Sequence, residues 1–231
     1  MATIARISQA SIVQATKKHT ATIFFFHGSG GTAENLKEWI NILNREKLQF
    51  PHIKLIYPSA PSQAYTPNNG MMQNVWFDRL AISNEAPEQL ESLDSMCQNV
   101  SEWIDREVAN GIPLNRIILG GFSMGGCLAL HLAYRYRTVA GCFAMSSFLN
   151  KRSIIYEHLK MNSEHNKIPL VQYHGLADSL VPIEWGEEGA KNLQDLGVNV
   201  TFIPLKNIEH DLSREEIQSW KDWLLNILPD K

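Results

Sequence analysis

One short segment has the residue types and the spacing of a nucleophilic site. Residues 121–125 read Gly-Phe-Ser-Met-Gly, a G-x-S-x-G motif centred on Ser123. The apolar run Ile117–Leu119 precedes this motif, and a helical pattern follows it. This context is typical of a nucleophile elbow, a strained strand-to-helix turn that exposes a serine hydroxyl and leaves room only for small neighbours. We therefore predict that Ser123 is a catalytic nucleophile.

A serine hydroxyl needs a base to accept its proton. The candidates downstream of Ser123 are His131, His158, His165, His174 and His210. Around such an elbow the usual chain order is serine, acid, histidine. Only His210 follows the last predicted strand and has an acid-bearing loop before it. We predict that His210 is the base, and the competing interpretation is an exposed loop histidine.

The base in turn needs an acid that orients it. Asp178 follows the predicted strand Leu170–Tyr173, whereas the other acidic residues of this region lie on a predicted helix surface or adjoin His210. We predict that Asp178 completes the triad. The alternative is that Asp178 only closes a turn or caps the helix that begins near Ile183.

An oxyanion hole requires two backbone N–H groups. One comes from the residue after the nucleophile, which is Met124. The second is expected from a loop after an early strand, and residues 27–31, His-Gly-Ser-Gly-Gly, follow three phenylalanines. We assign this second N–H to Ser29.

The same loop also supports a rival interpretation. Gly28, Gly30 and Ala33 satisfy the G-x-G-x-x-A pattern of dinucleotide-binding proteins. That pattern requires an acidic residue at the end of the next strand, but the next strand ends in Tyr57-Pro58. No metal-binding spacing and no phosphate-binding P-loop occurs in the sequence. We therefore expect neither a metal nor a cofactor.

Apolar runs alternate with helical patterns along the chain. The predicted strands are Thr22–Phe26, Ile53–Tyr57, Ile117–Leu119, Gly141–Met145, Leu170–Tyr173 and Val200–Leu205. The predicted helices are 90–108, Met124–Tyr136, Ser153–Asn162, Ile183–Leu196 and a last one that opens with the capping box Ser213-x-x-Glu216 and runs to about Leu228. This alternation predicts an α/β fold with a mainly parallel sheet covered by helices on both faces. The longest irregular stretch, Pro58–Val75, is expected to be a lid or binding loop.

Length and composition narrow the class of protein. The chain has 231 residues, 44% of them hydrophobic and 19% charged, and a net charge of −3. These values predict one domain over residues 1–231 with a full core, and they give no sign of nucleic-acid binding. The N-terminus lacks the apolar stretch of a signal peptide, and no apolar run approaches the ~18 residues of a membrane span. The three cysteines, Cys97, Cys127 and Cys142, suit reduced thiols, so we expect a cytoplasmic protein.

Four segments together resemble the acyl-protein thioesterase/lysophospholipase family. They are Phe26–Gly30, Trp76–Asp78, Asn115–Ser123 and Asp178–Pro182, and the resemblance extends from about Thr22 to Leu228. It implies an α/β-hydrolase fold without a large cap domain, and hydrolysis of acyl thioesters or oxyesters through an acyl-enzyme. It also implies Ser123, Asp178 and His210 as triad and the N–H groups of Ser29 and Met124 as oxyanion donors. Trp76, Phe148 and Leu180 are implied on the acyl-binding side, and ordinary core packing is the competing interpretation of Trp76 and Phe148.

Two departures from the family pattern concern the substrate. Phe148 and Asn150 stand where the family's main thioesterases have tryptophan and proline, and residue 2 is alanine rather than part of an acylated cysteine segment. Depalmitoylation and a preference for short acyl chains therefore remain competing hypotheses. The alternative from another functional class is a weakly active hydrolase scaffold that binds acylated partners.

Overall fold

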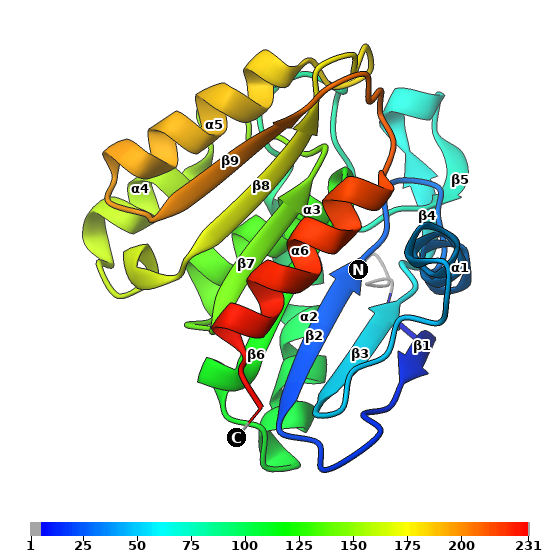
Figure 1. Cartoon of the computed structure of the whole chain (residues 1–231). Coiled ribbons are helices and arrows are strands. Elements are labelled where there is room, and N and C mark those ends of the chain that lie inside the picture. The colour runs from blue at the N-terminus through cyan, green and yellow to red at the C-terminus, as the bar shows by residue number, and fades with distance from the viewer. Residues whose placement is uncertain (1–5, 231) are drawn as a thin grey trace.

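A seven-stranded sheet forms the centre of the molecule (Figure 1). The structure is a computed structural model that describes residues 6–230. The strands lie in the order β1 (Ala10–Val13), β3 (Ile53–Pro58), β2 (Ala21–Phe26), β6 (Ile117–Phe122), β7 (Gly141–Met145), β8 (Leu170–Gly175) and β9 (Val200–Leu205). All neighbouring pairs are parallel except β1 with β3. The six predicted strands are confirmed, and the short antiparallel edge strand β1 was not predicted.

Helices cover both faces of the sheet, as the alternation predicts. They are α1 (Ala33–Asn44), α2 (Leu90–Ala109), α3 (Met124–His131), α4 (Ile154–Met161), α5 (Ile183–Asp195) and α6 (Arg214–Ile227). Helices α1 and α6 contribute to one hydrophobic core cluster, and α2 to α5 contribute to the other. In Figure 1, α6 crosses the front of the sheet and α1 lies beside it.

Strand β2 shows how the sequence separates the two cores. Phe24 and Phe26 pack into the cluster of α2 to α5, whereas Phe25 packs into the cluster of α1 and α6. Successive side chains of a strand point to opposite faces, so a continuous apolar run is required where both faces are buried. Phe25 contacts Trp220 of α6, with ring centroids 5.3 Å apart.

Two helix boundaries confirm the local signals of the sequence. The Ser213 side chain accepts the Glu216 N–H, and the Glu216 carboxyl group accepts the Ser213 N–H, so the capping box forms. Gly197 follows α5 with φ of +89°, a conformation that favours glycine after a helix end. The helix predicted over Met124–Tyr136 is α-helical only to His131 and continues as a π-helical turn, Leu132–Tyr136.

The stretch Pro58–Val75 is not irregular, which corrects the sequence-based expectation. It contains the antiparallel pair β4 (Ser62–Tyr65) and β5 (Met71–Asn74), joined by a short 3₁₀ turn. The sequence pattern hid this hairpin because its side chains are mostly polar or solvent-exposed and do not alternate. Within residues 6–230, no helix combines the length and the apolar character that a membrane crossing requires.

Candidate active site

The predicted site residues meet at one edge of the sheet. The ends of β2, β6, β7 and β8 are in register: Phe26 pairs with Gly121, Phe122 with Met145, and Met145 with Tyr173. Because these strands are parallel, the loops that follow them all emerge at their carboxyl ends. The sheet therefore brings together side chains that lie far apart in the sequence.

Ser123 occupies a strained turn between β6 and α3. Its φ of 54° and ψ of −120° are unfavourable for a residue with a side chain, and its N–H donates to the Met145 carbonyl at 2.8 Å. A Cβ on Gly121 would lie 2.6 Å from the Phe26 carbonyl oxygen, and one on Gly125 would lie 2.3 Å from that atom. The crowding that the motif predicts is present, and it explains the two glycines.

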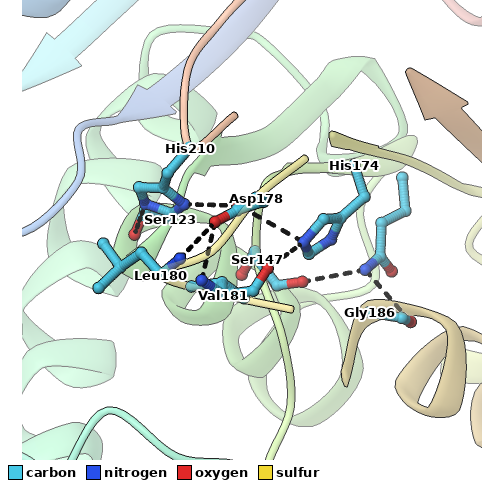
Figure 2. A network of polar contacts seen from close by, with 9 residues as sticks. Ser123, Ser147, His174, Asp178, Leu180, Val181, Gly186 and His210 are labelled. Atoms are coloured by element: carbon cyan, nitrogen blue, oxygen red, sulfur yellow. Dashed lines mark hydrogen bonds and ion pairs between the residues drawn. The ribbon is translucent and has the colours of Figure 1, made fainter. Parts of the chain in front are cut away.

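A chain of two hydrogen bonds links the three predicted triad residues (Figure 2). The Ser123 hydroxyl donates to His210 Nε2 at 3.0 Å. His210 Nδ1–H donates to Asp178 Oδ2 at 2.7 Å. This arrangement has the geometry that base-activated nucleophilic catalysis requires.

Asp178 is a buried carboxylate with several donors. Its Oδ1 accepts the N–H groups of Leu180 at 3.0 Å and Val181 at 2.8 Å, while Oδ2 faces His210. Burial alone would raise the pKa of Asp178, but the hydrogen bonds from His210 and Val181 outweigh it, and the pKa lies below its ordinary value. Asp178 is therefore ionised where His210 needs a negative partner.

His174 is a neighbour of the triad that sequence reasoning did not identify. Its imidazole is fully buried, and its Nε2 lies 3.6 Å from Asp178 Oδ2. The same Nε2–H donates to the Val181 carbonyl at 2.8 Å, so it closes the turn that holds Asp178 (Figure 2). Burial lowers the pKa of His174, which keeps the ring neutral beside the carboxylate. Its position four residues before Asp178, at the end of a strand, was the available signal.

The remaining candidate bases lie elsewhere. His131 is buried on α3, where its Nε2 is 3.2 Å from the Glu88 carboxylate. His158 and His165 contact each other, with ring centroids 5.2 Å apart, and His165 is bonded to the Ala133 carbonyl. These three histidines contact residues around α3 and α4, and His210 is the one bonded to the Ser123 hydroxyl.

The two predicted oxyanion donors lie in the loop after β2 and at the start of α3. Gly28 lies over Ser123, since a Cβ on Gly28 would be 3.3 Å from Ser123 Cβ. Ser29 follows in the same loop, and Met124 begins α3. Among the bonds formed by the described residues, neither the Ser29 N–H nor the Met124 N–H has a hydrogen-bond partner. Both groups are available to a developing negative charge.

His27 and Trp76 support the predicted oxyanion loop, residues 27–31. His27 Nδ1–H donates to the Gly28 carbonyl at 2.7 Å, and its Nε2 accepts the Ala60 N–H at 2.9 Å. Burial lowers the pKa of His27 to about 4, so it stays neutral and keeps both bonds. The Trp76 indole N–H donates to the His27 carbonyl at 2.7 Å, and the ring is fully buried. Trp76 thus supports the loop, and its predicted contact with an acyl chain stays a prediction.

The two other predicted substrate contacts differ in exposure. The Phe148 ring is buried and packs edge-on against Trp185 at 5.0 Å. The Arg79 guanidinium lies over the rings of both Phe77 and Phe148, at 5.1 and 5.2 Å. Leu180 is 49% exposed and lies next to the acid in the chain. Their roles in substrate binding stay predictions.

The three cysteines are unpaired and buried, and burial raises the pKa of each thiol. In the described part of the chain, no three His, Cys, Asp or Glu side chains gather as metal ligands would.

Comparisons with known proteins agree with this geometry. The model of the Phospholipase/Carboxylesterase family matches residues 7–228. Lysophospholipase-like protein 1 of Mus musculus is 49% identical over 220 residues, which cover 94% of this chain and 91% of the mouse protein. Acyl-protein thioesterase 1 homolog 2 of Dictyostelium discoideum is 32% identical over 220 residues, or 94% of this chain and 97% of that protein.

A solved structure shows the same architecture. The crystal structure of Zea mays acyl-protein thioesterase 2 superposes with a TM-score of 0.82 at 26% identity, over 95% of this chain and 99% of that one. The α/β-hydrolase fold is confirmed, and residues 6–230 contain no large cap domain. The fold, the family match and the relatives lead to one conclusion: the chain belongs to the Phospholipase/Carboxylesterase family of α/β hydrolases.

Proposed function

We propose that this protein is a serine hydrolase that cleaves acyl thioesters and oxyesters through an acyl-enzyme, with residues 1–231 acting as one catalytic domain. The observation that carries the proposal is the hydrogen-bond chain from the Ser123 hydroxyl through His210 to Asp178, with contacts of 3.0 and 2.7 Å. The family's thioesterase and carboxylesterase members supply the reaction class.

The proposed reaction has two halves. Ser123 Oγ attacks the acyl carbonyl carbon while His210 Nε2 takes its proton, and Asp178 stabilises the imidazolium that forms. The N–H groups of Ser29 and Met124 bind the oxyanion, each contributing about 3 kcal/mol to the transition state. His210 then protonates the leaving oxygen or sulfur, and water hydrolyses the acyl-enzyme with His210 as base.

We further propose a preference for short acyl chains over long ones. Phe148 packs against Trp185 and lies under the Arg79 guanidinium, which also covers Phe77, a residue of the core cluster to which α2 and α3 contribute. A palmitoyl chain would have to displace this stack, whereas an acetyl or butyryl group would not. Hydrolysis of a long-chain acylated protein or a lysolipid is the competing substrate assignment, and a small ester is the one that this packing favours.

The proposed setting is the cytoplasm, without nucleic-acid partners or a cofactor. Three buried cysteines without disulfides suit a reducing compartment. A net charge of −3 offers no excess of cations to a polyanion.

A chain-length series tests this function. The turnover of p-nitrophenyl esters from acetyl to palmitoyl is measured for the natural protein and for Ser123→Ala, together with fluorophosphonate labelling. We expect labelling at Ser123, a maximum at short chains, and a loss of about 10⁴-fold or more in the variant.

The other outcomes separate the alternatives. A maximum at long chains would reject the short-chain proposal and favour protein or lysolipid substrates. Equal activity in Ser123→Ala would reject the nucleophile. No Ser123-dependent turnover at any chain length would favour a scaffold that binds acylated partners.

A further inference from the structure

A cavity opens beside the oxyanion loop, on the face of the sheet that carries α1 and α6. It has a volume of about 230 Å³. One side of it is the loop that contains Gly28 and Ser29, and the other consists of residues of α1 together with Phe122. The lining contains no charged side chain at neutral pH. His27 is its titratable residue, and burial keeps that ring neutral.

Aromatic rings connect this cavity to the catalytic base. The Phe122 ring lies 4.9 Å from the His210 ring and 5.2 Å from the Trp39 ring, which it meets edge-on at 81°. Phe122 directly precedes the nucleophile, and Trp39 is a partly buried residue of α1. The Phe122 ring therefore forms part of the cavity wall and also contacts the His210 imidazole.

The mechanism of acyl transfer determines which way each part of the substrate faces around Ser123. The carbonyl oxygen must face the Ser29 and Met124 N–H groups. The leaving oxygen or sulfur must face His210 Nε2, because that atom delivers the proton when the bond to the acyl carbon breaks. The acyl chain takes the remaining direction. Phe122 and Trp39 belong to the core cluster of α1 and α6, and His210 contacts Phe122, whereas Phe77 packs in the cluster of the opposite side.

We propose that this cavity is the subsite for the leaving group, and that Trp39 and Phe122 select a compact, uncharged alcohol or thiol that carries one ring or a short branched chain. This inference rests on the proposed hydrolase function and adds the second half of the substrate to it. A cavity of ~150 Å³ accepts a benzene ring, so about 230 Å³ holds one ring with its linking methylene. The headgroup of a lysolipid carries charge, and this lining offers no partner for it.

The bond changes are those of ordinary transesterification. The bond from Ser123 Oγ to the acyl carbon forms, and the bond from that carbon to the leaving sulfur or oxygen breaks with its electron pair. The leaving atom takes the proton from His210 and departs through the cavity. In the reverse direction, an alcohol bound in the cavity attacks the acyl-enzyme in place of water, with His210 as base.

The reversed step supplies the test. The acetyl-enzyme is formed from p-nitrophenyl acetate, and benzyl alcohol or ethanol is added as a competing acceptor. The measured quantity is the partition ratio of acetyl ester to acetate, which does not depend on how much of a variant is folded. We expect benzyl alcohol to outcompete ethanol in the natural protein, and Trp39→Ala to reduce this selectivity about tenfold.

Two further variants sharpen the comparison. Trp39→Phe keeps a ring and is expected to retain most of the selectivity. Trp103→Ala removes a partly buried tryptophan of the same size from α2, where it packs against Arg106, and is expected to leave the ratio unchanged. A ratio that Trp39→Ala does not change, or that Trp103→Ala changes equally, would overturn the subsite. Failure to form any acetyl-enzyme on Ser123 would instead reject the proposed function on which it rests.

Discussion

At the scale of single residues, the site depends on groups whose charge is set by burial and hydrogen bonding. Asp178 is buried but accepts three hydrogen bonds, so it stays ionised. His27 is buried with one donor and one acceptor, so it stays neutral. The G-x-S-x-G motif and the chain order were enough to predict Ser123, Asp178 and His210 as candidates. The tautomer of His27 could not be predicted, because it depends on Ala60, a residue 33 positions away that only the fold brings close.

The pH dependence of turnover follows from these charge states. Acidification should reduce kcat/KM, because the base that accepts the Ser123 proton must be unprotonated. Near pH 4 the decrease should become steeper, since His27, with its pKa of about 4, also protonates and loses the Ala60 bond. His27→Gln, which can still accept that N–H but does not titrate, should lack this additional decrease near pH 4. A flat profile between pH 5 and pH 8 would exclude a histidine base, and circular dichroism at each pH would exclude unfolding.

At the scale of elements, strands with two buried faces were the most predictable part of the chain. The run of β2 supplies both cores, because all six of its residues are buried and successive side chains point to opposite faces of the sheet. The hairpin β4–β5 was missed because Gln63, Met71 and Met72 do not show an alternating pattern. Trp76 shows a related limit: an aromatic residue near a site is equally compatible with a substrate wall and with a buried support.

Glu216, in the first turn of α6, is predicted to make the free energy of unfolding depend on pH. Burial raises the pKa of Glu216 from 4.5 to about 8, against the opposing hydrogen bond from the Ser213 N–H. The folded state therefore binds this proton more tightly than the unfolded state, and the stabilisation is complete below pH 4.5 and is lost as the pH rises through 8. The free energy of unfolding should fall by about 2 kcal/mol between pH 6 and pH 8.

Glu216→Gln provides the control for α6. The amide retains an acceptor for the Ser213 N–H but cannot ionise. Chemical denaturation of this variant should give nearly the same unfolding free energy at pH 6 and pH 8. If the variant keeps the full pH dependence, another group is responsible.

At the scale of the whole molecule, the two ends of the sheet have different tasks. The carboxyl ends of the strands carry Ser123, Asp178 and His210, and partly buried hydrogen bonds join segments at the amino ends. Arg116, just before β6, donates to the Thr20 carbonyl at 3.0 Å, to the Thr20 hydroxyl at 3.2 Å and to the Pro229 carbonyl at 3.1 Å. It thereby joins the start of β2 to the segment after α6.

Arg116→Ala should separate stability from activity. Loss of a buried, charged donor should reduce the free energy of unfolding by about 3 kcal/mol, while kcat at 25 °C stays within twofold because Ser123 lies at the other end of β6. Arg116→Lys retains a cation but not the planar guanidinium, so its free energy of unfolding should lie between those of the natural protein and Arg116→Ala. Denaturant titration measures the free energy of unfolding, and ester turnover measures kcat. A large loss of kcat in the folded Arg116→Ala variant would contradict the separation of stability from activity.

The aligned strand ends have a consequence for how such a molecule can change over time. The loops that carry the proposed substrate contacts begin where β2, β6, β7 and β8 have finished pairing with their neighbours. Substitutions at Phe148 in such a loop, or at Trp39 on the adjacent helix α1, are expected to alter what is hydrolysed without affecting the hydrogen bonds of Arg116 at the opposite end of the sheet. New specificities can therefore be sampled, in nature or in a library, at little cost to the stability that keeps the chain folded.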